Sequence, residues 1–89
     1  MYFDFVYELR LVNKNGQVIK RILIIPDELT HFAPADDYKT NCIFLTKWAE
    51  DRKKGLLKLL GKNKGIFNIC AVRVIDGSTA FETDYIVVK

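Results

Sequence analysis

The feature that most constrains the fold is a strict alternation of side chains in residues 3–12, followed two residues later by an Asn-Gly pair. Every second residue is aromatic or leucine: Phe3, Phe5, Tyr7, Leu9 and Leu11. The intervening positions carry the charged residues Asp4, Glu8 and Arg10, together with Val6 and Val12. Because successive side chains of an extended backbone point to opposite faces, this pattern predicts a β-strand with one buried face.

Asn15-Gly16 is a strong hairpin signal, because both residue types tolerate a positive φ. Residues 17–25 are therefore predicted to form a second strand that pairs with the first. Pro26 ends this strand, since proline cannot donate a hydrogen bond to a neighbouring strand. The following residues, 26–40, have the composition of a loop, with one helical turn expected at Asp27 and Glu28.

A helical pattern follows, and its start is ambiguous. Apolar residues and one arginine recur at helical spacing: Leu45, Trp48, Ala49, Arg52, Leu56, Leu59 and Leu60. Residues 41–45 fit either a short buried strand or the first turns of this helix, and the spacing favours a helix from about Thr40 to Leu60. Gly55 weakens the middle and marks a bend or break, and Gly61 stands where a helix-ending glycine is expected.

The remaining residues read as two further strands. Residues 66–75 are apolar on both faces, which is typical of a central strand. A turn is predicted at residues 76–79, and a last strand at 80–88. The order β-β-α-β-β predicts an α+β fold: a four-stranded antiparallel sheet of two hairpins, with one helix packed on one face.

The second face of this sheet is left open by the sequence. The charged residues of the first strand indicate a solvated face, whereas the apolar central strand indicates a second apolar surface. Excess hydrophobicity there would mark a homodimer or partner contact.

Length and composition indicate one domain spanning residues 1–89, with enough apolar residues to fold without a metal or a disulfide. Cys42 and Cys70 lie within apolar runs, so we expect reduced, structural thiols. No run approaches the roughly 20 apolar residues that span a bilayer, and the first ten residues lack the pattern of a secretory signal. The sequence therefore predicts a cytoplasmic protein with no membrane insertion.

Positive charge is concentrated in one segment. Residues 41–65 carry seven basic and two acidic side chains, whereas residues 1–40 and 66–89 each sum to −1. A cationic amphipathic helix and the following Gly61–Gly65 loop attract acidic partners through long-range Coulomb forces. The candidate partner-binding residues are Lys47, Lys54, Lys58, Lys62, Asn63 and Lys64. Lysines at the end of a helix also complement its dipole, which is a structural reason for some of them.

No catalytic constellation is recognisable. His31 and four acids, Asp27, Glu28, Asp36 and Asp37, lie within a span of eleven residues, and this group could bind a cation or supply an acid–base pair. Loop acids, however, more often cap turns and helix starts. Ser78 is the sole serine and falls in a turn, which argues against a serine nucleophile. We therefore expect no catalytic residues, no cofactor and no metal.

The function expected from these patterns is that of a small non-enzymatic interaction protein, a regulator or inhibitor that docks its basic helix and loop onto an acidic macromolecular partner. The alternative is sequence-tolerant binding of nucleic acid by the same lysines. A small enzyme or metal site around His31 is less favoured. A membrane-surface role for the helix ranks last, because its leucines are needed to cover the sheet.

Overall fold

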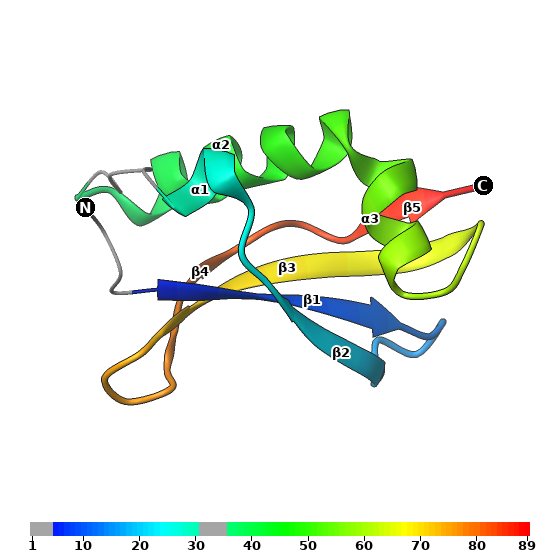
Figure 1. Ribbon diagram of the computed structural model, residues 1–89, viewed down its shortest axis with the longest axis horizontal. Coiled ribbons are helices and arrows are strands. Elements are labelled where there is room, and N and C mark those ends of the chain that lie inside the picture. Colours follow the sequence, from blue (N-terminus) through cyan, green and yellow to red (C-terminus); the bar gives the residue numbers. More distant parts are fainter. Residues whose placement is uncertain (1–4, 31–35) are drawn as a thin grey trace.

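The computed structural model describes residues 5–30 and 36–89, and it is a small α+β domain with helices on one side of an antiparallel sheet (Figure 1). The elements in chain order are β1 (Phe5–Val12), β2 (Val18–Ile24), α1 (Asp27–Thr30), α2 (Tyr38–Asp51), α3 (Lys53–Leu59), β3 (Gly65–Arg73), β4 (Thr79–Glu82) and β5 (Ile86–Val88). The predicted fold class and the approximate order β-β-α-β-β are confirmed. The predicted helical turn at Asp27 is also present, as α1.

The sheet has the order β2-β1-β3-β4, and β5 also pairs with β3. The two central strands, β1 and β3, are antiparallel in a register that runs from Phe5 opposite Arg73 to Val12 opposite Ile66. Both predicted hairpins exist, and the predicted central strand over residues 66–75 is β3, which ends at Arg73, so that Val74 and Ile75 lie exposed beyond it. The pairing of β1 with β3 joins the two hairpins into one sheet.

The prediction of a single last strand over residues 80–88 was wrong in one respect, because this segment is divided into β4 and β5. At the division, the Ile69 N–H donates to Thr83 Oγ1 over 3.0 Å, and the Thr83 N–H donates to the Ile69 carbonyl over 2.9 Å. The Thr83 hydroxyl thus replaces a backbone carbonyl in the ladder. As a result β4 and β5 follow one another along the same side of β3.

The first hairpin turns at Asn15-Gly16, but with a longer loop than a two-residue turn. The Asn13 N–H donates to the Gln17 carbonyl over 2.9 Å, and the Gly16 N–H donates to the Asn13 carbonyl over 3.0 Å. Gly16 has a φ of 78°, whereas no described non-glycine residue, Asn15 included, has a positive φ. The loop therefore contains three residues, with glycine at the left-handed position.

α2 begins at Tyr38 with Asp37 as its N-cap, so the ambiguous residues 41–45 are helical, as favoured by their spacing. The Asp37 carboxylate accepts from the backbone N–H groups of Lys39 and Thr40 and, over 2.6 Å, from the Thr40 hydroxyl. These bonds satisfy donors that the first turn of a helix leaves without a carbonyl partner.

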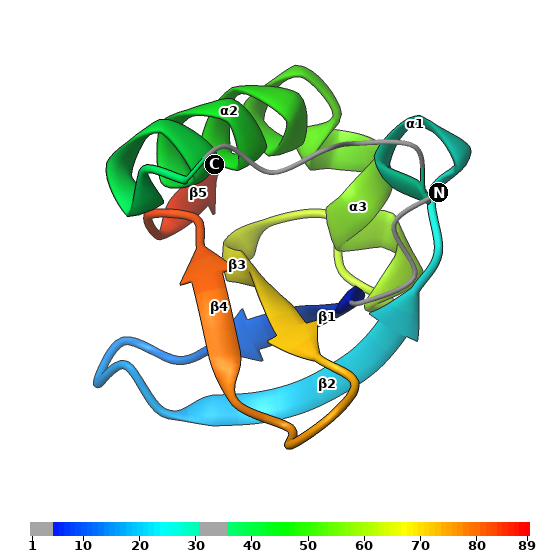
Figure 2. The same ribbon diagram turned by 90° about the vertical axis from the view of Figure 1, so that its left-hand side faces the viewer.

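The predicted single helix is broken at Arg52, three residues before Gly55. Arg52 has φ −123° and ψ 15°, and its guanidinium lies 4.7 Å from the centre of the Trp48 ring and 3.6 Å from Glu28 of α1. Figure 2 shows that α3 runs in a different direction from α2. The change of direction brings Leu57 to the end of the sheet where Gly65 begins β3.

The core lies between the helices and the sheet. Its fully buried side chains come from both central strands and from all three helices, and include Leu9, Leu29, Leu45, Leu57, Leu60, Phe67 and Ile69. The helical spacing placed Leu59 and Arg52 on the apolar stripe, but both are exposed, and Leu57 is buried instead. The break at Arg52 rotates α3, so one continuous helical periodicity does not describe both helices.

The second face of the sheet is polar at its centre. Here Cys70 and Asn68 of β3 are buried, beside half-buried Glu8 and Arg10 of β1 and Glu82 of β4. Arg10 Nε donates to Glu8, and the Cys70 thiol lies 3.3 Å from the Glu82 carboxylate. The two-sided burial of β3 therefore reflects a polar cluster on this face rather than a second apolar layer.

Candidate functional site

Three of the six predicted partner-binding residues line one pocket of about 300 Å³, which is formed by Lys54, Gly55, Lys58 and Asn63. Lys54 and Lys58 are four residues apart on α3, so they lie on one face of that helix. Gly55 lies between them and leaves open space, because nothing stands within 4 Å of where a side chain would begin. Two lysines and one asparagine therefore line this pocket, beside the open space at Gly55.

The turn after α3 returns Asn63 toward the helix. Gly61 adopts a φ of 78°, its N–H donates to the Lys58 carbonyl over 2.9 Å, and the Lys62 N–H donates to the Leu57 carbonyl over 3.3 Å. This pair of bonds is the Schellman motif, which confirms Gly61 as the helix-ending glycine. Lys62 and Lys64 are exposed on the loop that follows.

Lysines from distant parts of the sequence reach the same end of the molecule. The Lys20 ammonium of β2 lies 3.4 Å from the Leu60 carbonyl, at the end of α3. Val12 pairs with Ile66, which places the hairpin loop with Lys14 beside the start of β3. Val88 pairs with Gly65, which places Lys89 there as well.

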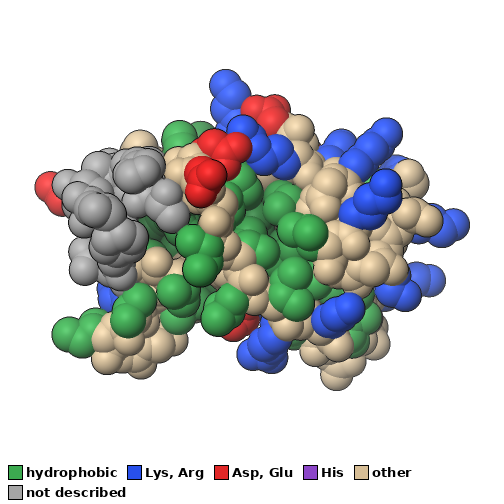
Figure 3. Space-filling view, in the orientation of Figure 1, with side chains coloured by type: hydrophobic (Ala, Val, Ile, Leu, Met, Phe, Trp, Pro, Cys, Tyr) green, Lys and Arg blue, Asp and Glu red, His purple; other side chains and the backbone are tan. Residues whose placement is uncertain are grey.

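We call this surface the basic end, and it comprises Lys14, Lys20, Lys54, Lys58, Lys62, Lys64 and Lys89. On the face shown in Figure 3, blue side chains gather over the right-hand end, where α3 and the C terminus lie. The acidic side chains visible in this view lie away from that end. Sequence reasoning missed Lys14, Lys20 and Lys89, because only the pairing of β2 with β1, and of β1 and β5 with β3, brings them to this end of the molecule.

Within the described ranges, the last four lysines of residues 41–65 lack the ion pairs that the two basic residues just before them form. Arg52 pairs with Glu28 over 3.6 Å, and Lys53 with Glu50 over 3.8 Å. By contrast, Lys54, Lys58, Lys62 and Lys64 form no ion pair with any acidic residue in the ranges 5–30 and 36–89. Their charge is therefore not neutralised by a described carboxylate.

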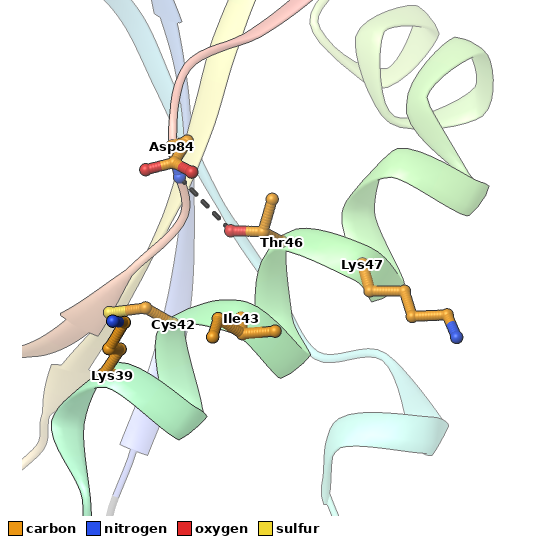
Figure 4. Close-up of a pocket in the computed structure, with 6 residues that line it drawn as sticks. All are labelled: Lys39, Cys42, Ile43, Thr46, Lys47 and Asp84. Atoms are coloured by element: carbon orange, nitrogen blue, oxygen red, sulfur yellow. Dashed lines mark hydrogen bonds between the residues drawn. The ribbon is translucent and has the colours of Figure 1, made fainter.

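Lys47 lies in a different environment from the other five predicted residues. It lines a pocket of about 480 Å³ on α2 with Lys39, Cys42, Ile43, Thr46 and Asp84. Figure 4 shows the Asp84 N–H bonded to the Thr46 hydroxyl, and the Lys47 side chain extending away from them. The structure therefore brings Lys54, Lys58 and Asn63 together and leaves Lys47 outside their pocket.

The two cysteines are free thiols, and their surroundings differ. Cys70 is fully buried, and burial raises its pKa to about 12. The Asn68 amide and the Glu82 carboxylate lie 3.7 Å and 3.3 Å from its sulfur. A thiol that keeps its proton is a weak nucleophile, so this environment favours a structural role for Cys70.

Two of the four acids near His31, Asp37 and Glu28, have structural partners. His31 itself lies outside the described residues. Asp37 caps α2, and its hydrogen bond from the Thr40 hydroxyl lowers the pKa of its carboxyl group. Glu28 pairs with Arg52. Within the described part of the chain, no three His, Cys, Asp or Glu side chains are grouped so as to hold a metal ion.

A comparison of the chain with protein-family models found no matching family, and searches of curated proteins and of solved structures found no significant match. Among the helices of the described residues, none is long and apolar enough to cross a membrane.

Proposed function

We propose that this protein is a small, non-enzymatic interaction protein that docks its basic end onto an acidic surface of a macromolecular partner. The observation that supports it is the convergence of lysines from the first hairpin, α3, the following loop and the C-terminal strand. Among these, Lys54, Lys58, Lys62 and Lys64 form no ion pair with a carboxylate of the described residues. A concentrated field of one sign steers an oppositely charged partner and sets its orientation. By covering that acidic surface, the protein would regulate or inhibit its partner.

The geometry suggests how the surface would discriminate among acidic partners. The pocket between Lys54, Lys58 and Asn63 can admit one projecting carboxylate, with the Asn63 amide as an additional donor. The surrounding lysines are exposed, so each contributes little by itself. Affinity would therefore come from several simultaneous ion pairs and would decrease as salt screens them.

A second candidate, nucleic acid, is favoured by one exposed aromatic side chain. Tyr85 is 61% exposed, and its hydroxyl lies about 4.0 Å from the position of a side chain at Gly16, in the hairpin that carries Lys14. An exposed ring beside lysines can stack on an unpaired base while the lysines contact phosphates. A single ring offers a limited stacking platform, so an acidic protein remains the leading proposal.

The test compares two variants that lose the same charge. One is Lys54→Gln/Lys58→Gln/Lys64→Gln, at the basic end. The other is Lys39→Gln/Lys47→Gln/Lys53→Gln, which removes three lysines of α2 and the start of α3. Affinity capture with cross-linking from cell extract should retain the same acidic protein on the wild type and on the second variant, and lose it on the first. Equal retention by both variants would contradict the proposal.

The wild type and the two lysine variants should then be titrated with short single- and double-stranded DNA and RNA at two salt concentrations. Nucleic-acid binding by the basic end predicts a logarithmic salt slope of roughly −0.9 for each phosphate neutralised on duplex DNA. It also predicts that Tyr85→Ala weakens binding to single strands without changing binding to an acidic protein. Salt-insensitive or absent binding would exclude the second candidate.

A further inference from the structure

The two edges of the sheet differ in whether they can accept another strand. On one edge, β4 and β5 are four and three residues long and are separated at Thr83, whose hydroxyl and N–H both bond to Ile69. The adjacent Asp84 N–H bonds to Thr46 of α2. Short, interrupted strands tied to a helix are poor templates for pairing.

The other edge is longer, and its pairing with β1 is regular from Lys20 to Ile24, with one irregularity between Val18 and Lys20. β2 extends over seven residues from Val18 to Ile24, and among the described strands it pairs only with β1. Its outer side therefore presents a row of backbone N–H and C=O groups, which an added strand can pair. Apolar side chains stand along it, with Ile19 58% and Leu23 64% exposed.

The charges along this edge indicate which charge an added strand should carry. Residues 13–25 contain the basic side chains Lys14, Lys20 and Arg21 and no acidic one. In a strand, Lys20 and Arg21 point to opposite faces, so an added strand meets a basic side chain on each face. Arg21 lies 3.8 Å from the Glu8 carboxylate but is itself 61% exposed. A second copy of this chain would bring the same positive charges against them, and like charges across strands destabilise pairing. An acidic strand would instead be attracted.

We propose that the β2 edge binds an extended, acidic segment of the partner by β-strand addition. This inference rests on the proposed function, because Lys20 belongs to both surfaces: it lies in β2, and its ammonium reaches the end of α3. Backbone hydrogen bonds supply affinity, and alternate side chains supply specificity. Carboxylates of the segment meet Lys20 and Arg21, apolar side chains cover Ile19 and Leu23, and the chain continues onto the basic end.

The experiment uses the full chain and two peptides of about ten residues, a length that spans one strand. In the first, valine alternates with glutamate. The second has the same charge, with proline in place of two central valines, so that it cannot form a backbone ladder. We expect the first peptide to bind, to shift the amide signals of residues 18–24 in nuclear magnetic resonance spectra, and to slow their hydrogen exchange. The proline peptide should bind at least about tenfold more weakly.

Variants of the protein separate the edge from the basic end. Leu23→Glu should weaken binding of the alternating peptide at least about tenfold, because it places a carboxylate beside the glutamates of the added strand. Val87→Glu on β5 is the matched control, since Val87 is also exposed, and it should leave binding unchanged. Equal binding of both peptides, shifts confined to residues 53–64, or no binding up to about 1 mM would overturn the edge proposal.

Failure of the edge proposal can be told apart from failure of the proposed function. If the Lys54→Gln/Lys58→Gln/Lys64→Gln variant loses the captured partner while β2 amides do not respond to the alternating peptide, the basic end is supported and strand addition is overturned. If that variant keeps its partner and Leu23→Glu loses it, docking through the basic end is overturned and strand addition is supported. A dimer that Leu23→Glu dissociates would overturn the acidic occupant in favour of a second copy.

Discussion

The two faces of the central strands β1 and β3 are buried by different means. Toward the helices, Leu9, Phe67 and Ile69 are fully buried among apolar side chains. On the opposite face, Cys70 is equally inaccessible, but its neighbours are Glu8, Arg10, Asn68 and Glu82. The difference shows that burial of a central strand on both sides does not require two apolar layers, because long charged side chains can cover a strand that no helix covers.

The polar cover has consequences for chemistry as well as for packing. It excludes water from the Cys70 thiol while keeping charged groups near it, so the thiol is both protected and held in its protonated form. The apolar layer supplies most of the free energy of folding, because hydrophobic stabilisation scales with the apolar area removed from water. Substitutions on the two faces should therefore differ in size and in kind.

The largest expected difference is in thiol reactivity. A pKa of about 12, against an ordinary 9.0, lowers the thiolate fraction of Cys70 about a thousandfold at neutral pH. In the folded protein, iodoacetamide should therefore modify the half-buried Cys42 long before Cys70. A time course of labelling, followed by mass spectrometry of the Cys42→Ser and Cys70→Ser variants, assigns a modification rate to each remaining thiol. In denaturant the two thiols should react alike, and rapid labelling of native Cys70 would contradict the polar cover described above.

The largest loss of stability should follow a substitution under the helices. Phe67→Ala removes a fully buried ring and leaves a cavity, so it should lower the free energy of unfolding by about 3–5 kcal/mol. On the opposite face, Val87→Ala removes a half-exposed side chain and should cost less than about 1 kcal/mol. Urea unfolding followed by circular dichroism measures both. Similar costs for the two would remove the distinction between the faces.

An intermediate effect is expected within the polar cover. Arg10→Met keeps the side-chain length but removes the donor to the half-buried Glu8 carboxylate, and should cost about 1–2 kcal/mol. Arg21→Met is the matched control, because Arg21 lies 3.8 Å from the same carboxylate and is 61% exposed. It should change stability by less than about 0.5 kcal/mol. A double-mutant cycle of Arg10→Met with Glu8→Gln tests whether the loss belongs to this pair.

The smallest effect concerns the helix layer that covers the apolar face. Asp37 caps α2, and the Thr40 hydroxyl holds the pKa of its carboxyl below the ordinary 3.8. Because the folded-state pKa is lowered, the cap stabilises the protein above pH 3.8, and this contribution is lost as pH falls through the folded-state value. Asp37→Ala should lower the free energy of unfolding at pH 7 and make it depend less steeply on pH below pH 4. Asp37→Asn should keep the cap and lose only the pH dependence.

Much of the fold could be predicted because its signals are local. Alternation in residues 5–12 requires only the geometry of one strand, and the ends of the helices depend on Asp37 and Gly61, which bond to residues three or four positions away. The break at Arg52 was misplaced at Gly55 because its partners include Glu28, which is distant in sequence. The division at Thr83 was missed for the same reason, since its bonds go to Ile69.

The candidate site was predicted in part. Lys54, Lys58, Lys62, Asn63 and Lys64 are contiguous in a helix and its following loop, so charge counting along the chain found them. Lys47 was included on that same count, but it lines another pocket. Whether any of these residues binds a partner stays a prediction.

The sequence by itself determined the α+β class, the two hairpins, the position of the helical segment and the concentration of positive charge, because each depends on residues within a few positions of one another. Only the tertiary structure decided that Lys14, Lys20 and Lys89 join that charge, that the second face is covered by polar side chains, and that β2 lies at an edge of the sheet formed by the described strands. Each of these depends on which strands pair and in what register. Such pairing joins residues as far apart as Lys20 and Leu60, and periodicity along a chain carries no record of it.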